Sequence, residues 1–276
     1  NYFWIDNIAT TINMKKTFII TTSLLILAAI SGVFTSCKQP NKGSLLGQLI
    51  QNEPDTITKE YNIDKFDALE VENLVDVTLE QGDRYSLKIV SSQTILDRIK
   101  VKNELGELNI EVDESGLSQI KNPQCKAYLT VPSLRNIELS GAASLKGKTG
   151  ANQFFCDAPV TIKCDEASRI SGLTIKATGF DIKAESASSI KDMNIRTTGD
   201  IKIKSEEASS INMNISASGK SEIKAESASK ITLRGKINIG IFKAEEASNI
   251  TADQLQCQSK SISAESASRI SVDNPK

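Results

Sequence analysis

A short word recurs six times at near-constant spacing in the second half of the chain. Each copy ends in EAS or SAS, and the intervals between the final serines are 20, 21, 20, 19 and 20 residues. These serines are Ser168, Ser188, Ser209, Ser229, Ser248 and Ser268. A period near 20 is typical of leucine-rich repeats or of β-solenoids. Leucine is scarce in this region, so the period favours a β-solenoid.

Aligning the copies on this serine gives columns of constant character. The residue six positions earlier is large and apolar: Ile162, Ile182, Ile203, Ile223, Phe242 and Ile262. The next residue is Lys163, Lys183, Lys204, Lys224, Lys243 or Ser263, and then comes a small one: Cys164, Ala184, Ser205, Ala225, Ala244 and Ala264. An acidic residue follows: Asp165, Glu185, Glu206, Glu226, Glu245 and Glu265. This alternation predicts a strand with one buried face.

Isoleucine stands two positions after the serine in every copy. These residues are Ile170, Ile190, Ile211, Ile231, Ile250 and Ile270. A second apolar run follows, as in LTIKATG at 173–179, and no helical period appears. We therefore predict an all-β, single-stranded parallel β-helix (β-solenoid) with coils of about 20 residues. Parallel crossovers are right-handed in nearly all proteins, which predicts the hand.

The corner of each coil explains the repeated word. The alanine before each serine predicts a corner too tight for a larger side chain. The serine hydroxyl is expected to satisfy backbone groups that a turn leaves unpaired. A variant occurs at 134–147, LRNIELSGAASLKG, where Ser144 is 24 residues before Ser168 and is expected to occupy the serine position.

The acidic column has two interpretations. Stacked like charges repel, but the lysine column points from the same face, which predicts cross-paired Lys and Glu ladders on a solvated surface. A cation site is the alternative, although the GGxGxD pattern of calcium-binding β-rolls is absent. We predict no metal and no cofactor.

The two ends of the repeat region differ. Residues 56–124 predict an irregular β cap or first coils, with a hairpin around Gly106 and a hairpin or tight turn at Gln81-Gly82-Asp83. Residues 125–276 hold the β-helix repeats. No capping element is evident after Ile270, so a homo-oligomer through the C-terminal coil is expected.

A leader-like segment precedes the repeats. Residues 1–13 predict an upstream artefact or fragment, and residues 14–36 combine Lys15 and Lys16 with an apolar run, which predicts a signal peptide. A retained membrane anchor and a buried helix are the alternatives. VFTSC resembles the lipobox of bacterial lipoproteins, which implies lipidation of Cys37, with 37–55 as a polar tether. Multiple acyl chains anchor a protein stably.

Composition narrows the function classes. The chain has no histidine, which removes Ser-His-Asp and Cys-His catalysis. Its formal net charge of −1 offers no electrostatic footprint for nucleic acid. After lipidation, Cys125, Cys156, Cys164 and Cys257 remain. An exported chain could pair them, but the repeat makes Cys164 a small buried residue, which favours free buried thiols.

The chain resembles the family called putative auto-transporter adhesin, head GIN domain, found in many Bacteroidetes lipoproteins. FDALEVENLVDVTLEQGD, SLRNIELSGAAS and the EAS/SAS-x-I copies carry the resemblance, over roughly residues 58–272. It implies a right-handed β-helix, an envelope location and an adhesin role, with no catalytic residues to carry over.

Three functional interpretations are open. The uniform columns favour a non-enzymatic lipoprotein that presents a rigid β-helix for adhesion or scaffolding, exported and anchored to the outer membrane on its periplasmic face or at the cell surface, with an unidentified glycan or protein ligand. The alternative is a polysaccharide lyase or hydrolase, for which Arg169, Arg196, Arg234 and Arg269 are candidates better explained as solvated side chains. An ice-binding solenoid would need threonine ladders, and Lys and Glu stand there instead.

Overall fold

The computed structural model describes residues 56–117, 123–150 and 153–272. The chain divides into two units, Asn1–Gln48 and Leu49–Lys276, and all described residues lie in the second. Cys37 and the predicted leader, signal and tether segments therefore lie outside the described residues. Within the described ranges, no helix has the length and apolarity needed to cross a membrane.

The described part of the chain is all-β, as predicted. About 64% of its residues are in strands, which belong to one sheet of twenty strands that does not close. The short helix α2 spans Gln93–Leu96. The strands are β1 Ile57–Tyr61, β2 Ala68–Glu72, β3 Val75–Gln81, β4 Ser86–Ser91, β5 Ile99–Glu104, β6 Glu107–Val112, β7 Cys125–Val131, β8 Asn136–Ser140, β9 Ser144–Gly147, β10 Phe154–Phe155, β11 Val160–Cys164, β12 Arg169–Ser171, β13 Thr174–Ala177, β14 Phe180–Ala184, β15 Ser189–Thr197, β16 Ile201–Ser205, β17 Ser210–Ala225, β18 Lys230–Ala244, β19 Asn249–Ala264 and β20 Arg269–Val272.

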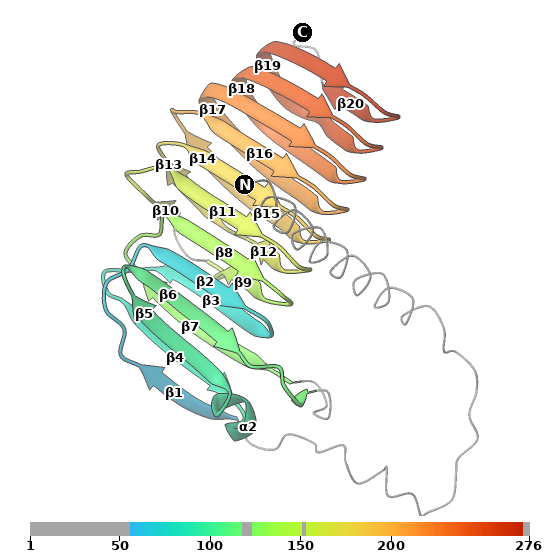
Figure 1. The fold of residues 1–276 in the computed structure, drawn as a ribbon. Helices are drawn as coiled ribbons and strands as arrows, with labels where there is room; N and C mark the ends of the chain where they lie inside the picture. Colours follow the sequence, from blue (N-terminus) through green and yellow to red (C-terminus); the bar gives the residue numbers. More distant parts are fainter. Residues whose placement is uncertain (1–55, 118–122, 151–152, 273–276) are drawn as a thin grey trace, which may run out of the picture. The chain divides into compact units, whose positions relative to one another are not determined.

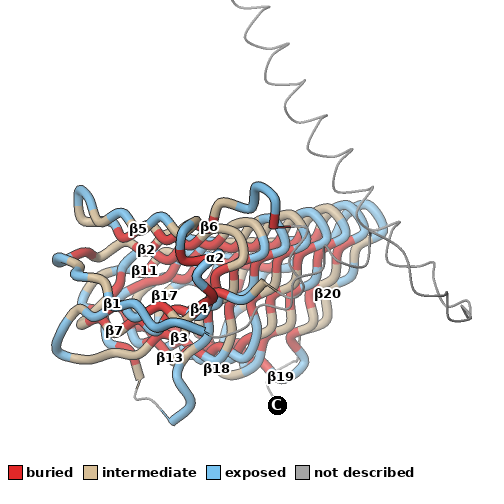
Figure 2. Tube along the Cα trace, turned by 90° about the horizontal axis from the view of Figure 1, so that it is seen from below, coloured by how far each residue is buried: buried red, intermediate tan, exposed pale blue. Residues whose placement is uncertain are grey.

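Equivalent strands of successive repeats pair in parallel and in register (Figure 1). Ile190 lies opposite Ile211, and Ile211 lies opposite Ile231, as the column alignment predicts. These isoleucines are fully buried. Figure 2 shows the buried segments in red on the inside of the stack and exposed turns at its rim. A continuous apolar core therefore runs through all the repeats.

The corner before each serine is a tight turn whose two central residues both have positive φ. In one repeat these are Glu207 at 51° and Ala208 at 61°, and the Ser209 N–H donates to the Glu206 carbonyl at 3.1 Å. A left-handed conformation costs a non-glycine residue about 1–2 kcal/mol. The Ala208 N–H donates to the Ser227 carbonyl of the next repeat at 2.9 Å, which offsets that cost.

The alanines are exposed, so the predicted steric reason for them is wrong. The constraint is the backbone conformation: a β-branched side chain at positive φ would be strained far more than a methyl group. The same pair of positive φ values recurs in all six corners. The EAS or SAS sequence recurs because each corner must adopt this conformation to form its hydrogen bond with the corner of the next repeat.

The serine prediction is confirmed for the five buried serines, Ser168, Ser188, Ser209, Ser229 and Ser248. Each of their hydroxyls donates to a carbonyl of the preceding repeat, for example Ser209 to Ala184 at 2.8 Å. The half-buried Ser268 hydroxyl instead accepts from the Ser248 N–H at 3.2 Å. For Ser144 the prediction is wrong by one residue. It lies opposite Arg169, and fully buried Ala143 occupies the serine position instead. The spacing from this first corner to Ser168 is longer than the spacing between later corners, so the sequence alone did not show which residue occupies the serine position.

The N-terminal strands stack out of chain order. β2 lies between β6 and β8, and β3 lies between β7 and β9, all in parallel. β5 and β6 form the predicted antiparallel hairpin around Gly106. The hairpin considered at 81–83 is absent, because β7 separates β3 from β4 and pairs with both. The antiparallel strands β1, β4 and β5 thus end the stack on this side.

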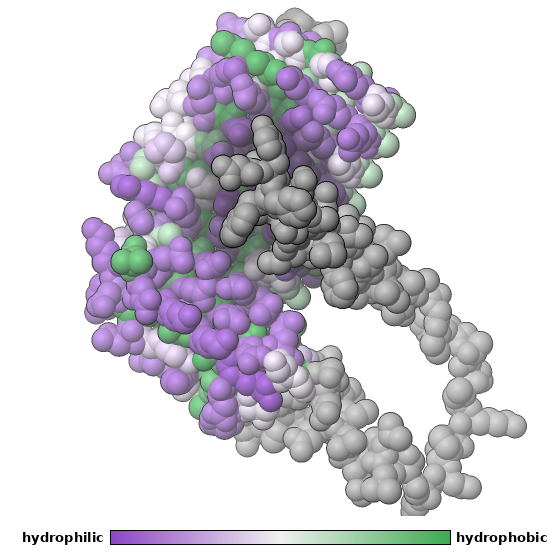
Figure 3. All heavy atoms as spheres, in the orientation of Figure 1, coloured by the Kyte–Doolittle hydropathy of each residue, from purple (hydrophilic) through white to green (hydrophobic). Residues whose placement is uncertain are grey.

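The C-terminal end is more open. Ile262, in the large apolar column, is 48% exposed, and Ile270 and Val272 are half-buried. Lys260 lies opposite buried Gly240, and its ammonium donates to the Val272 carbonyl at 3.2 Å. Figure 3 shows mostly hydrophilic residues on the visible face, with apolar ones at this upper end. The homo-oligomer expected at this end stays a prediction.

The four described cysteines are buried and free. Burial raises the pKa of the Cys125 thiol to about 12, and the nearby Asp76 carboxylate adds to the effect. Burial also raises the pKa of Cys164. Thiols held protonated in this way are poor nucleophiles, so Cys125 and Cys164 are packing residues, as predicted for Cys164.

Candidate functional site

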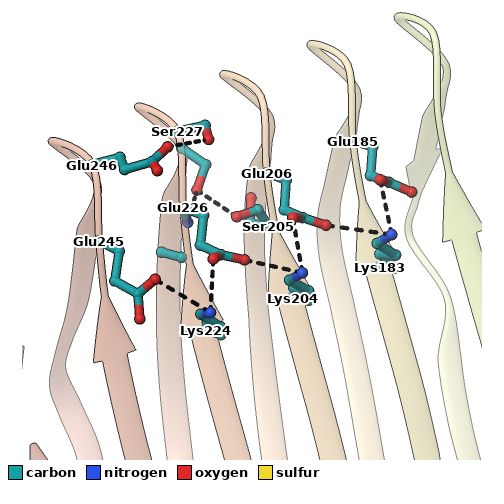
Figure 4. Close-up of polar contacts among 12 residues, drawn as sticks. Lys183, Glu185, Lys204, Ser205, Glu206, Lys224, Glu226, Ser227, Glu245 and Glu246 are labelled. Atoms are coloured by element: carbon teal, nitrogen blue, oxygen red, sulfur yellow. Dashed lines mark hydrogen bonds and ion pairs between the residues drawn. The ribbon is translucent and has the colours of Figure 1, made fainter. Parts of the chain in front are cut away.

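Two outward faces of the repeats carry lysine, and they differ in what surrounds it. The first face holds the lysine and acidic columns at the corner. Lys204 contacts Glu206 of its own repeat at 2.8 Å and Glu226 of the next at 3.0 Å. The same zigzag continues through neighbouring repeats (Figure 4), joining Glu185, Lys183, Glu206, Lys204, Glu226, Lys224 and Glu245 at 2.7–3.3 Å. We call these seven residues the Lys–Glu ladder.

The ladder is partly shielded from water, since its side chains are 18–35% exposed. Burial alone would raise the pKa of Glu226, but hydrogen bonds and charges from Lys224 and Lys204 lower it to about 2. Burial alone would lower the pKa of Lys204, but its contacts with Glu206 and Glu226 raise it. Each acidic group is thus neutralised by lysine. The prediction of cross-paired ladders is confirmed for the repeats from Lys183 to Glu245.

No group of three or more potential metal-ligating side chains occurs among the described residues. The acidic column, considered as a cation site from sequence, has lysine ammonium groups as its close partners instead. The ladder is therefore a structural feature of the stack rather than the candidate site.

The second face lies on the second apolar run of each repeat. One column of outward side chains runs through six strands in register: Phe155, Lys176, Arg196, Ser216, Lys236 and Gln256. We call it the basic column. All six residues are exposed. Within the described part of the chain, Lys176, Arg196 and Lys236 form no ion pair with a carboxylate. Three cations are thus left without counter-charge on one face.

A second column lies two residues before the basic column and is rich in amides. Its members are Thr174, Asn194, Asn214, Arg234 and Gln254. Arg234 donates to Gln254 Oε1 at 2.8 Å and to Asn212 Oδ1 at 3.0 Å. Its partners are neutral, so its positive charge is not cancelled. We call this the amide column.

The two columns border a hollow of about 630 Å³, within the size range of small-molecule sites. A second hollow, of about 360 Å³, shares Arg196 and Ser216 with it and extends to Phe155. Gly235 lines the larger hollow with φ of 108°, and a Cβ there would lie 2.1 Å from the Ile215 carbonyl oxygen. Only glycine fits at that position.

Phe155 closes the N-terminal end of the basic column. Phe155 is 55% exposed, and the Lys176 ammonium lies 5.7 Å from the centroid of its ring. A cation over a ring face is stabilised by the ring quadrupole. The arrangement leaves an accessible aromatic surface beside cationic and amide groups, which is chemistry suited to binding.

The structure separates the four arginines considered from sequence. Arg196 and Arg234 lie on this face, whereas Arg169 lies opposite Ser189, and Arg269 opposite Asn249, in a column near the corner. The basic column was missed because the alignment stopped at the second apolar run. The sequence does contain a signal for part of it: Lys176, Arg196 and Ser216 each directly follow an isoleucine, and each stands three positions before a glycine. Cys37, predicted as the lipidation site, lies outside the described residues.

A model of the family described as putative auto-transporter adhesin, head GIN domain, matches residues 65–275. The chain belongs to this family. No curated protein matches it.

One solved structure, the first of the three that follow, shares the fold. A putative adhesin from Bacteroides fragilis matches with a TM-score of 0.51 at 16% identity, covering 78% of this chain and 97% of that one. A putative lipid binding protein from Parabacteroides distasonis matches with a TM-score of 0.40 at 16% identity, over 78% and 98%. A putative adhesin from Parabacteroides merdae matches with a TM-score of 0.33 at 13% identity, over 78% and 98%. An adhesin family is consistent with a protein of the cell envelope.

Proposed function

We propose that this protein is a non-enzymatic, adhesin-like or scaffolding lipoprotein of the cell envelope, which presents a rigid β-helix as a binding surface. Family membership supports the adhesin-like role. The observation that carries the proposal is the basic column, where Lys176, Arg196 and Lys236 stand in register without counter-charge. Lys176 and Arg196 stand in adjacent strands, where like charges repel, and a bound anionic partner would relieve that repulsion.

The proposed fold is a right-handed parallel β-helix. Its support is the in-register parallel pairing of strands about 20 residues apart, from β11 through β20. A strand that returns in parallel to the same sheet nearly always does so with a right-handed crossover. Such a stack holds its outward columns at fixed spacing, which suits an extended binding surface.

The proposed anchor is a lipid on Cys37, the cysteine of VFTSC. A signal peptide at 14–36 would direct export, and acyl chains on Cys37 would hold the protein to the outer membrane. The tether at 37–55 would then separate the β-helix from the bilayer.

A polysaccharide lyase or hydrolase is the alternative. Glycoside hydrolysis commonly needs a pair of carboxylates at the scissile bond. The described residues that line the two hollows supply ammonium, guanidinium, amide and hydroxyl groups, and none is Asp or Glu. The lack of carboxylates among these lining residues favours binding over hydrolysis.

The test has two parts. Cells expressing the wild-type chain or Cys37→Ser are fed a labelled fatty acid, and incorporation only into the wild type supports the anchor. Protease shaving of intact cells then reports the membrane face. Cleavage supports adhesion at the surface, and protection supports a scaffold facing the periplasm. A Cys37→Ser chain that is labelled equally contradicts the lipoprotein proposal.

A further inference from the structure

We propose that the basic and amide columns form a site for an acidic polysaccharide, which lies along the stacking direction of the repeats. The inference rests on the proposed binding function and names its ligand class. Three observations carry it: the unneutralised charge, the regular spacing of that charge, and the neutral polar groups and aromatic ring beside it.

The charge favours an anionic partner. Lys176, Arg196 and Lys236 line the two hollows, and Arg234 of the amide column adds a guanidinium bonded only to neutral oxygens. The chain as a whole has a formal net charge of −1. The positive charge of this face therefore comes from its own residues and does not reflect an excess of positive charge over the chain as a whole.

The spacing favours a polymer. Neighbouring strands lie about 4.8 Å apart, so Lys176 and Arg196 are separated by about 5 Å, and Arg196 and Lys236, two repeats apart, by about 10 Å. The strand register fixes these positions on one line. A single phosphate or carboxylate cannot contact all three cations, whereas a chain with anionic groups recurring along its length can.

The neighbouring groups favour sugar. Asn194, Asn214 and Gln256 offer amides that both donate to and accept from hydroxyl groups, and Ser216 adds a hydroxyl. Phe155 offers an exposed ring at the end of the column, on which the apolar face of a sugar could stack. A single-stranded nucleic acid would need several aromatic platforms, and a membrane surface would need more apolar side chains than Phe155 supplies.

The test measures binding of the full chain, in detergent, to polygalacturonate, dextran sulfate and neutral dextran. The variant Lys176→Gln/Arg196→Gln/Lys236→Gln removes the basic column. Its matched control, Lys88→Gln/Lys126→Gln/Lys202→Gln, removes the same charge from exposed lysines outside the hollows. Thermal unfolding of both variants verifies that the fold is kept. Phe155→Ala is a second, independent variant.

We expect the wild type to bind at least one of the two acidic polymers and not dextran, with affinity that falls as salt screens the charges. Binding of polygalacturonate alone would identify carboxylates as the recognised groups, and binding of dextran sulfate alone would identify sulfates. The basic-column variant should raise the Kd at least about 10-fold, a difference of about 1.4 kcal/mol. Phe155→Ala should raise it several-fold, and the control variant should leave it within about 2-fold, since the same charge is removed elsewhere.

Four results would overturn the inference: no binding to either polymer, equal binding to dextran, an equal loss in the control variant, or equal binding of phosphatidylglycerol vesicles or single-stranded DNA through the same residues. A protein that binds neither polymer but is lipidated at Cys37 and cleaved on intact cells would leave the proposed function standing. The two failures are therefore distinguishable.

Discussion

The Lys–Glu ladder and the basic column are built in the same way and differ in their neighbours. In both, the strand register stacks side chains of one kind about 4.8 Å apart. In the ladder, a glutamate two residues after each lysine neutralises it, as Glu206 does for Lys204. Beside the basic column, two residues before Arg196, stands the neutral Asn194. Stacked charge is therefore structural where a neighbouring side chain cancels it, and a candidate for function where none does.

The largest effect is expected from the core that both faces share. Ile211→Ala removes a fully buried side chain that lies opposite Ile190 and Ile231. The free energy of unfolding should fall by about 2–5 kcal/mol, measured by chemical denaturation. A loss below about 1 kcal/mol would mean that this column is not a packed core.

The corner should be more sensitive than the basic column to the loss of a hydroxyl. Ser209→Ala removes hydrogen bonds to the Ala184 carbonyl, the Glu206 N–H and the Ser205 hydroxyl. We expect a loss of about 1–3 kcal/mol in the free energy of unfolding. Ser216→Ala, at an exposed position of the basic column, is the matched control and should change stability by less than about 0.5 kcal/mol. Equal losses would contradict the difference between the two regions.

Removal of one cation should change the stability of the protein differently on the two faces. Lys204→Met leaves Glu206 and Glu226 each with one lysine partner fewer and should cost about 1 kcal/mol of stability. Arg196→Met breaks no ion pair and relieves repulsion from Lys176, so stability should be unchanged or slightly higher. Paired denaturation curves measure both. If Arg196→Met destabilised the protein and Lys204→Met did not, the claim that only the Lys–Glu ladder stabilises the stack would be contradicted.

The Lys–Glu ladder should also make the stability of the protein depend on pH. The pKa of Glu226 lies at about 2, below its ordinary 4.5, so its contribution to stability is present above pH 4.5. That contribution should be lost as the pH falls from about 4.5 toward 2, because the unfolded chain binds the proton first. Thermal unfolding across this range should show a flatter decline for Glu226→Gln than for the wild type. Parallel curves would show that the ladder does not hold Glu226 ionised.

Much of this architecture is encoded in local pattern. The columns through Ile190 and Lys183 could be aligned from sequence because a strand alternates sides and the corner fixes its own length. The role of the corner serine was predicted correctly, but the reason for the corner alanine was not. The positive φ of Ala208 accompanies a hydrogen bond from its N–H to the next repeat, which the sequence does not show. The order of the N-terminal strands could not be predicted from the sequence, because β2 pairs with β8 and the five strands β3 to β7 lie between them in the chain.

The candidate site was harder to predict than the fold. Arg196 and Arg234 looked like solvated side chains because a single residue gives no sign of its counter-charge. Only the register across β13, β15, β17 and β18 shows that Lys176, Arg196 and Lys236 share one line. A charged side chain indicates a binding site only when no carboxylate lies near it. Whether one lies near it depends on the three-dimensional structure and cannot be seen in the sequence.

In-register stacking underlies both faces, and distance measurements between spin labels test it most directly. Labels are placed on the outward lysine column, at 163 with 243 and at 163 with 263, using non-cysteine chemistry that leaves the buried thiols alone. These pairs span four and five repeats, so the backbone separations should be about 19 Å and about 24 Å. An increase of about 5 Å for the added repeat is the result that stacking predicts, and a second distance equal to or shorter than the first would contradict it.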